Sequence, residues 1–154
     1  MRDEFLEIAI EEAKKAGELG EVPVGAVIVK ADKVIAKAHN LKETRNDVTA
    51  HAELLAMKKA SEVLNNWRLN ECEVYVTLEP CAMCASAIVQ SRIKKLYIGT
   101  FEPTMGACGS VINLVQNETL NSFVQVEWLY NHECSKMITE FFKKRRENET
   151  KVKG

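Results

Sequence analysis

The spacing of hydrophobic residues along the chain predicts alternating helices and strands. In residues 3–18, apolar side chains recur every three or four positions, as on one face of an amphipathic helix. By the same spacing and by helix-start signals, further helices are predicted over residues 50–64, 80–91, 110–115 and 129–146. Runs rich in β-branched and aromatic residues predict strands over residues 24–29, 34–38, 73–78, 94–99 and 123–127.

The order of these elements predicts an α/β fold. Polar residues around Asp32 separate the first two strands and favour a hairpin. The later strands alternate with helices, which favours a largely parallel sheet with helices on both faces. We therefore expect a three-layer α/β/α arrangement around a central five-stranded mixed sheet.

Length and composition indicate one folded domain. The chain has 154 residues, 46% of them hydrophobic, and shows no internal repeat and no linker, so we expect a single domain over residues 1–154. The longest stretch without a charged residue, residues 103–117, is too short and too polar to span a bilayer. The N-terminus lacks a basic region followed by an apolar core. We expect a cytoplasmic protein with no membrane partner.

Charge is distributed unevenly. Residues 1–134 carry a net charge of −5 and residues 135–154 a net charge of +4, if histidines are neutral. The basic end of the last helix and the tail, about residues 143–154, suits contact with a polyanion, although Lys143–Arg146 is most simply a solvated helix end. The rest of the domain gives no sign of nucleic-acid binding, and no DNA partner is expected.

Two short fragments carry the candidate chemistry, and each lies at a predicted helix start. The first contains His51 and Glu53, and the second contains the pair Cys81 and Cys84. One imidazole and two thiolates favour zinc over hard cations such as magnesium. Cysteines three positions apart on a helix present their sulfurs on one face, and a helix N-terminus favours the thiolate form. Five cysteines in all argue against a disulfide framework.

Three protein ligands leave the fourth tetrahedral position of a zinc ion open, which is typical of a catalytic site. Zinc can bring the pKa of a water molecule to roughly 7, and that step needs a neighbouring base. Glu53 is two residues from His51, so its side chain points away from the ligand direction and is free to shuttle the proton.

Each fragment alone has simpler interpretations. His-x-Glu is common on helices as a cap or a solvated pair. Cys-x-x-Cys can be a redox pair, part of a structural zinc site or two buried small residues. Together and in this order, the fragments match the zinc-deaminase signature H-x-E…P-C-x-x-C.

With these motifs the chain resembles the bacterial tRNA-specific adenosine deaminases, a family with the cytidine deaminase-like fold. The resemblance covers nearly the whole chain. Besides the signature, it rests on the segments Glu21–Val27, His39–Asn40, Asp47–Glu53, Val76–Cys84, Ser91–Ile93, Gly106–Ser110 and Phe141–Arg146.

The resemblance implies a homodimer that deaminates the wobble adenosine in the anticodon loop of an arginine tRNA to inosine. His51, Cys81 and Cys84 would hold one zinc ion per chain. Glu53 would move protons from the attacking water to the purine ring and then to the departing ammonia. The expected substrate contacts are Asn40 with the flipped nucleoside, Val24 with its base, and the loop 101–106, which includes Glu102, with the RNA backbone and flanking nucleotides.

Two departures from the family pattern fall in expected RNA contacts. Val48 stands where the family usually has proline, and the loop reads Glu102-Pro103-Thr104-Met105 where aspartate and lysine are typical. Losing the lysine removes a plausible phosphate contact. A zinc deaminase of a free purine base or nucleoside, such as guanine, is therefore an alternative, and a zinc-stabilised RNA-binding domain without turnover is a third hypothesis, against which an intact Glu53 argues.

Overall fold

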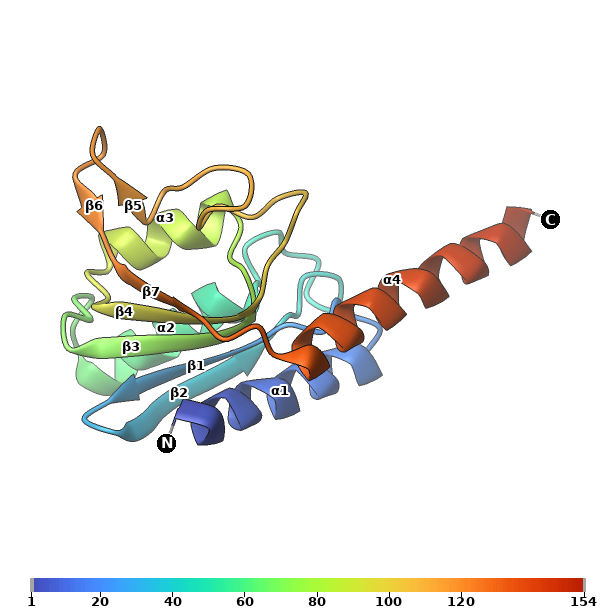
Figure 1. The fold of residues 1–154 in the computed structure, drawn as a ribbon. Helices are drawn as coiled ribbons and strands as arrows, with labels where there is room; N and C mark the ends of the chain where they lie inside the picture. Colours follow the sequence, from blue (N-terminus) through green and yellow to red (C-terminus); the bar gives the residue numbers. More distant parts are fainter. Residues whose placement is uncertain (1, 154) are drawn as a thin grey trace.

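The computed structural model describes residues 2–153. Its helices, labelled in Figure 1, are α1 (Arg2–Glu18), α2 (Ala52–Leu64), α3 (Ala82–Gln90) and α4 (His132–Lys153). The strands are β1 (Gly25–Lys30), β2 (Lys33–His39), β3 (Cys72–Leu78), β4 (Lys95–Thr100), β5 (Gln116–Asn117), β6 (Ser122–Phe123) and β7 (Gln125–Trp128).

The main sheet has five strands in the order β2-β1-β3-β4-β7, and β5 and β6 form a separate two-stranded sheet. β3, β4 and β7 run parallel, whereas β1 is antiparallel to both β2 and β3. The turn between β1 and β2 consists of Ala31 and Asp32, both with positive φ, as a two-residue hairpin with the right-handed strand twist requires. The mixed five-stranded sheet is confirmed.

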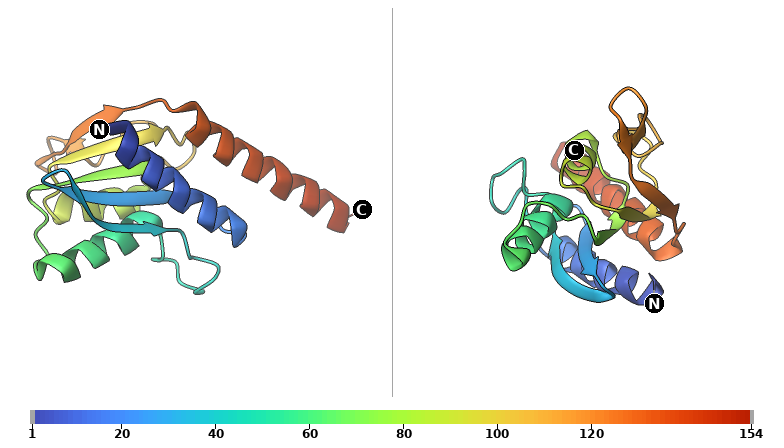
Figure 2. Two further views of the ribbon diagram at one scale, coloured as in Figure 1. Left: turned by 90° about the horizontal axis from the view of Figure 1, so that it is seen from below. Right: turned by 90° about the vertical axis from the view of Figure 1, so that its left-hand side faces the viewer.

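Helices cover both faces of the sheet, as the three-layer prediction requires. Alternate residues of each strand point to opposite faces, so Val27 and Val29 pack with α1 and with Cys134 of α4, while Ala26 and Ile28 pack with α2 and α3. Figures 1 and 2 show α1 and α4 on one side and α2 and α3 on the other. No helix within residues 2–153 is long and apolar enough to cross a membrane.

Gly25 allows α1 to lie directly on the start of β1. A Cβ atom at this position would come within 1.9 Å of the Ala9 carbonyl oxygen and 2.6 Å of the Ala13 nitrogen, both backbone atoms of α1. Only glycine permits this approach. The contact fixes the start of β1, next to Val24.

Two predictions for residues 110–127 were wrong. Residues 110–115 form no helix, because Glu79 accepts the Ser110 N–H and an isolated bridge pairs Cys108 with Asn113. The predicted strand over 123–127 is divided, since Phe123 belongs to β6 and only Gln125 onwards joins the main sheet as β7.

The last helix begins later and ends later than predicted. Leu129 and Asn131 donate their N–H groups to β4 carbonyls, so the chain continues beside the sheet until residue 131. The Asn131 side chain then accepts the Cys134 N–H at 3.0 Å and caps α4. Tyr130, which falls within the predicted helix over residues 129–146, instead has a positive φ and is 71% exposed. The helix continues past residue 146 to Lys153, and residue 154 lies outside the described residues.

Candidate active site

His51 and Cys81 occupy equivalent places at the N-termini of two helices. His51 is the N-cap residue of α2 and Cys81 that of α3, and both have extended backbones. Their carbonyls accept the first intrahelical hydrogen bonds, from Leu55 at 3.0 Å and from Ala85 at 2.8 Å. The predicted helix starts at residues 50 and 80 were therefore two residues early, but both fragments do lie at helix starts.

The structure brings His51, Cys81 and Cys84 together. The Nδ1 atom of His51 lies 3.7 Å from the Sγ of Cys81 and 3.4 Å from the Sγ of Cys84. One nitrogen and two sulfur atoms thus converge within 4.8 Å of one another, from segments 30 residues apart in the sequence. Among residues 2–153 this is the one group of His, Cys, Asp and Glu side chains arranged to hold a metal ion.

Hydrogen bonding within this cluster polarises the two thiols. A hydrogen bond from the Cys84 thiol, assisted by His51, lowers the pKa of Cys81 to about 3. Its hydrogen bond with Cys81 raises the pKa of Cys84, and burial adds to the shift. The hydrogen bond to Cys81 likewise raises the pKa of His51. Cys81 therefore has thiolate character, and the thiolate is the form of cysteine that binds metals.

Glu53 lies in the first turn of α2 and contacts the same cluster. Its side chain is 4% exposed and hydrogen-bonds the Cys84 thiol. Burial raises the pKa of Glu53 to about 7. A carboxyl group with such a pKa both gives and takes a proton near neutral pH, as a general acid and base must.

Asn40 and Val24 lie beside the start of α2. The Asn40 Oδ1 accepts the Ala52 N–H at 2.8 Å, and its Nδ2 donates to the Val22 carbonyl at 3.2 Å. Its own N–H donates to the Val24 carbonyl, so Asn40 ties the end of β2 to both segments. Val24 is 5% exposed and belongs to the core on the α2 side.

Glu102 lies on the loop after β4, and its carboxylate is already engaged. It accepts hydrogen bonds from the N–H and the hydroxyl of Thr104, both at 2.8 Å. The neighbouring side chains Phe101 and Met105 are 53% and 64% exposed. The tip of this loop thus presents apolar side chains, whereas the acid stabilises the turn.

Sequence reasoning missed two buried acids that hold the loops around the site. Glu21 is 1% exposed and accepts the N–H groups of Glu43 and Thr44, at 3.0 and 2.6 Å, together with the Thr44 hydroxyl. Glu79 is 2% exposed and accepts hydrogen bonds from the loop 102–110. A glutamate directly before Pro80 and Cys81 was the available signal for the second of these.

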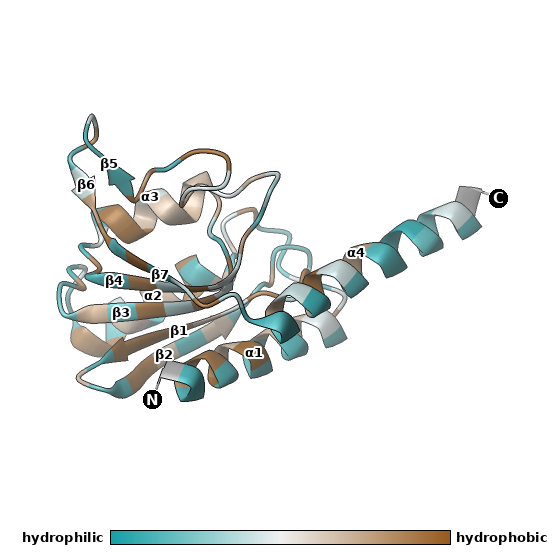
Figure 3. Ribbon diagram, in the orientation of Figure 1, coloured by the Kyte–Doolittle hydropathy of each residue, from teal (hydrophilic) through white to brown (hydrophobic). Residues whose placement is uncertain are grey.

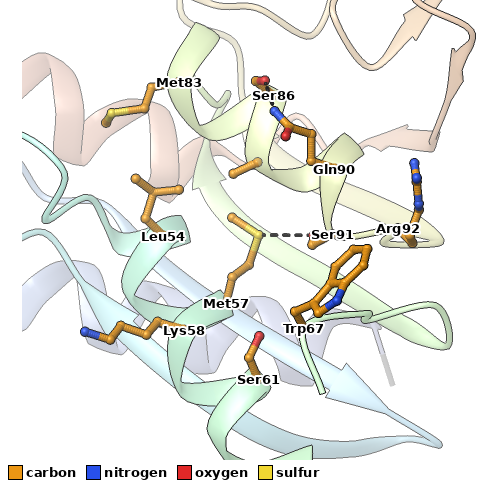
Figure 4. A pocket seen from close by; sticks show the side chains of 11 residues that line it. Leu54, Met57, Lys58, Ser61, Trp67, Met83, Ser86, Gln90, Ser91 and Arg92 are labelled. Atoms are coloured by element: carbon orange, nitrogen blue, oxygen red, sulfur yellow. Dashed lines mark hydrogen bonds between the residues drawn. The ribbon is translucent and has the colours of Figure 1, made fainter. Parts of the chain in front are cut away.

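A groove of about 640 Å³ lies between α2 and α3, outside the cluster. Figure 4 shows Met57, Met83 and Trp67 lining it, with a hydrogen bond from the Ser91 hydroxyl to the Met57 sulfur. None of the candidate catalytic or metal-binding side chains lines this groove.

The remaining cysteines and His39 have structural surroundings. Cys72, Cys108 and Cys134 are buried free thiols, and burial raises the pKa of each. His39 pairs with Glu12 of α1 at 3.0 Å. These surroundings give the three cysteines a role in core packing and His39 a role in joining β2 to α1.

Known proteins share both the sequence and the fold. The family of MafB19-like deaminases matches residues 2–146. A tRNA-specific adenosine deaminase of Aquifex aeolicus is 49% identical, over 96% of this chain and 97% of its own. A structure from work on A-to-I editing by tRNA:A34 deaminases at the wobble position superposes with a TM-score of 0.84 at 42% identity, covering 88% of this chain and 99% of that one. A guanine deaminase of Bacillus subtilis gives a TM-score of 0.62 at 33% identity, over 75% of this chain and 84% of its own.

Proposed function

This chain belongs to the family of tRNA-specific adenosine deaminases, and from that premise we propose that it converts the wobble adenosine of an arginine tRNA to inosine. The observation that carries the proposal is the convergence of His51, Cys81 and Cys84 beside the buried carboxyl of Glu53. Water replaces the amino group at C6 of the purine, and ammonia is the second product.

The donor set fits zinc. One imidazole nitrogen and two sulfurs within 4.8 Å of one another suit a borderline-soft ion, and three protein ligands are the number found in catalytic zinc sites. The thiolate character of Cys81 further favours a cation. We expect one zinc ion per chain, and the chemistry that it supplies when bound is activation of a water molecule near neutral pH.

Glu53 carries the proton transfers. In its ionised form it accepts a proton from the attacking water and delivers it to N1 of the adenine ring. Glu53 then takes the second proton from the hydroxyl group that has been added at C6 and delivers it to the amino group, which leaves as ammonia. The burial that raises its pKa to about 7 also excludes bulk water, so protons move between Glu53 and the substrate.

Asn40, Val24 and Glu102 are the proposed substrate contacts. Two of the Asn40 hydrogen-bonding groups are committed to Ala52 and Val22, which leaves one N–H of its amide to donate to the nucleoside. Val24 packs against the base. Glu102 contributes to RNA binding indirectly, because its carboxylate stabilises the turn of the loop that also carries the exposed Phe101. The base must leave the stack of the anticodon loop to reach this site.

The partner is a tRNA anticodon stem-loop, and the basic run Lys143–Arg146 at the exposed part of α4 supplies electrostatic attraction to it. The proposal further includes a cytoplasmic homodimer of chains that each form one zinc-dependent deaminase domain. Sedimentation of the zinc-loaded protein at twice the mass of one 17.3 kDa chain would support the dimer.

Ammonia release from zinc-loaded protein tests the proposed function. The substrates are an arginine anticodon stem-loop with adenosine at the wobble position, the same loop with guanosine there, free adenosine, guanine and cytidine. We expect release from the adenosine stem-loop alone, with about one zinc per chain, and loss of release after chelation. Release from guanine with a silent stem-loop would instead assign a free-base deaminase.

A further inference from the structure

We infer that Glu79 is a positioning residue for this reaction, which holds the substrate loop in register with the metal-binding residues. The inference rests on the proposed function. Glu79 lies two residues before Cys81, and its carboxylate is enclosed by the loop 102–110. No part of its carboxylate is available to the substrate, so it acts through the loop.

All the hydrogen bonds to this carboxylate come from that loop. Oε1 accepts the Glu102 N–H at 2.9 Å and the Ser110 hydroxyl, and Oε2 accepts the N–H groups of Cys108 and Ser110 at 3.0 and 3.1 Å. Each oxygen thus accepts two hydrogen bonds, which is the full capacity of a carboxylate. One side chain therefore holds both ends of the nine-residue segment 102–110.

The backbone around Glu79 reinforces the same connection. The Glu79 N–H donates to the Thr100 carbonyl, and the Ala107 N–H donates to the Pro80 carbonyl, both at 2.9 Å. Gly106 makes room for the carboxylate, since a Cβ atom there would lie 2.4 Å from the Glu79 Cδ atom. These contacts therefore connect the segment that contains Cys81 directly to the loop that contains Glu102.

The Glu79 carboxylate is stabilised by hydrogen-bond donors of the loop and not by a cation. No basic side chain in the part of the chain that the structure describes forms an ion pair with it. Three N–H groups and one hydroxyl converge on the two oxygens, an arrangement that stabilises an anion and that a neutral amide cannot reproduce. The loop conformation consequently depends on a carboxylate at position 79.

The test is Glu79→Gln, which keeps the side-chain size but places an NH₂ group among hydrogen-bond donors. We expect the KM for the adenosine stem-loop to rise by about tenfold, since hydrogen bonds to a charged acceptor are lost, while kcat stays within about threefold. Zinc content should stay at about one per chain. Amide hydrogen exchange should accelerate at Glu102, Cys108 and Ser110 and remain unchanged in β1 and β3.

Two further variants separate positioning from general destabilisation. Ser110→Ala removes one donor and should raise KM in the same direction by a smaller factor, even where the Glu79 variant folds poorly. Glu12→Gln replaces a buried acid on the opposite face of the sheet, and it should lower the melting temperature without changing KM.

Three outcomes are decisive. If Glu79→Gln changes neither KM nor amide exchange in the loop 102–110, the inference is overturned. It is also overturned if this variant loses zinc and exchanges faster throughout the chain, because Glu79 would then be a purely structural residue. A wild-type protein that is silent on the stem-loop would refute the proposed function instead. In that case, faster amide hydrogen exchange confined to the loop 102–110 of the Glu79→Gln variant would still show that Glu79 holds this loop.

Discussion

Glu53 combines two properties that seldom occur together in one carboxyl group. It is almost completely buried, yet it pairs with no basic side chain in the described ion pairs, and its side chain hydrogen-bonds the Cys84 thiol. Burial without a cationic partner favours the protonated form and raises the pKa to about 7. The pKa of Glu53 therefore lies near neutral pH, where its carboxyl group can both accept and donate a proton.

Replacing Glu53 with Gln should abolish turnover and leave the metal centre intact. The amide is close in size but cannot take a proton, so we expect kcat on the adenosine stem-loop to fall by at least about 10²- to 10⁴-fold. Zinc content, measured by atomic emission, should stay at about one per chain. Glu62→Gln, on the exposed side of the same helix, serves as the control. Substantial residual activity would show that another group moves the proton.

The residues that could be predicted from the sequence are those that belong to a recognisable motif. His51, Glu53, Cys81 and Cys84 could be recognised because together, and in this order, they match the signature H-x-E…P-C-x-x-C. The place of Glu79 directly before Pro80 and Cys81 was a signal, but its partners could not be predicted, since most of them are backbone N–H groups 23 to 31 positions away. Backbone groups are the same at every residue, so no pattern of side chains announces such a contact.

At the scale of elements, α1 is joined to β2 through a buried polar contact. Glu12 accepts hydrogen bonds from Lys15 at 2.7 Å and pairs with His39 of β2 at 3.0 Å. Burial by itself would raise the pKa of Glu12, but the hydrogen bonds from Lys15 and His39 outweigh it and lower the pKa below the usual 4.5. The contact therefore stabilises the folded state in proportion to the ionisation of Glu12.

The stability that this contact provides should depend on pH. Because the pKa of Glu12 is lower in the folded than in the unfolded chain, the stabilisation is complete above pH 4.5 and is lost as the pH falls further through the folded value. Glu12→Gln should lower the free energy of unfolding by about 1–2 kcal/mol at pH 7 and by progressively less below pH 4.5. Urea unfolding of both proteins across this range measures the difference. A difference that is constant with pH would contradict this origin.

Most helices and strands follow from local patterns, and the exceptions have long-range causes. Residues 110–115 have enough apolar side chains for a short helix, but the Glu79 carboxylate and the bridge from Cys108 to Asn113 fix the chain in another conformation. Phe123 is typical of a strand, yet it is 71% exposed, because it lies in the small β5–β6 hairpin. Local propensity could not indicate which sheet this residue joins.

In the whole molecule, the C-terminal part of α4 is a basic arm attached to an acidic body, since residues 1–134 carry a net charge of −5 and residues 135–154 one of +4. Its first turns pack on the sheet through Cys134 and Met137, and Figures 2 and 3 show the rest extending beyond the sheet as a hydrophilic helix. Lys143–Arg146 are all exposed on this part. Their charge is free to meet a phosphate backbone without any change in the core.

Changing Lys143–Arg146 to serine should weaken binding of the stem-loop and flatten its salt dependence. The slope of log affinity against log salt should decrease by about 0.7 for each phosphate contact that is lost. Fluorescence anisotropy with labelled stem-loop at several salt concentrations measures both quantities. A control with Lys33 and Lys94 changed to serine removes charge at the other end of the sheet, where Lys33 follows the hairpin turn and the Lys94 N–H donates to Cys72, and it should leave the slope unaltered. An affinity equal to that of the wild type would make the run an ordinary solvated helix end.

The two buried acids divide each active-site loop into an anchored base and a free tip. Glu21 fixes the loop at residues 43–44 and Glu79 fixes the other at 102, 108 and 110, whereas Val48, Pro103, Thr104 and Met105 stay exposed. Substitutions at the tips can therefore accumulate during evolution without disturbing the reacting atoms. Under the proposed function, such a scaffold allows the RNA contacts at the loop tips to change without displacing His51, Cys81 or Cys84.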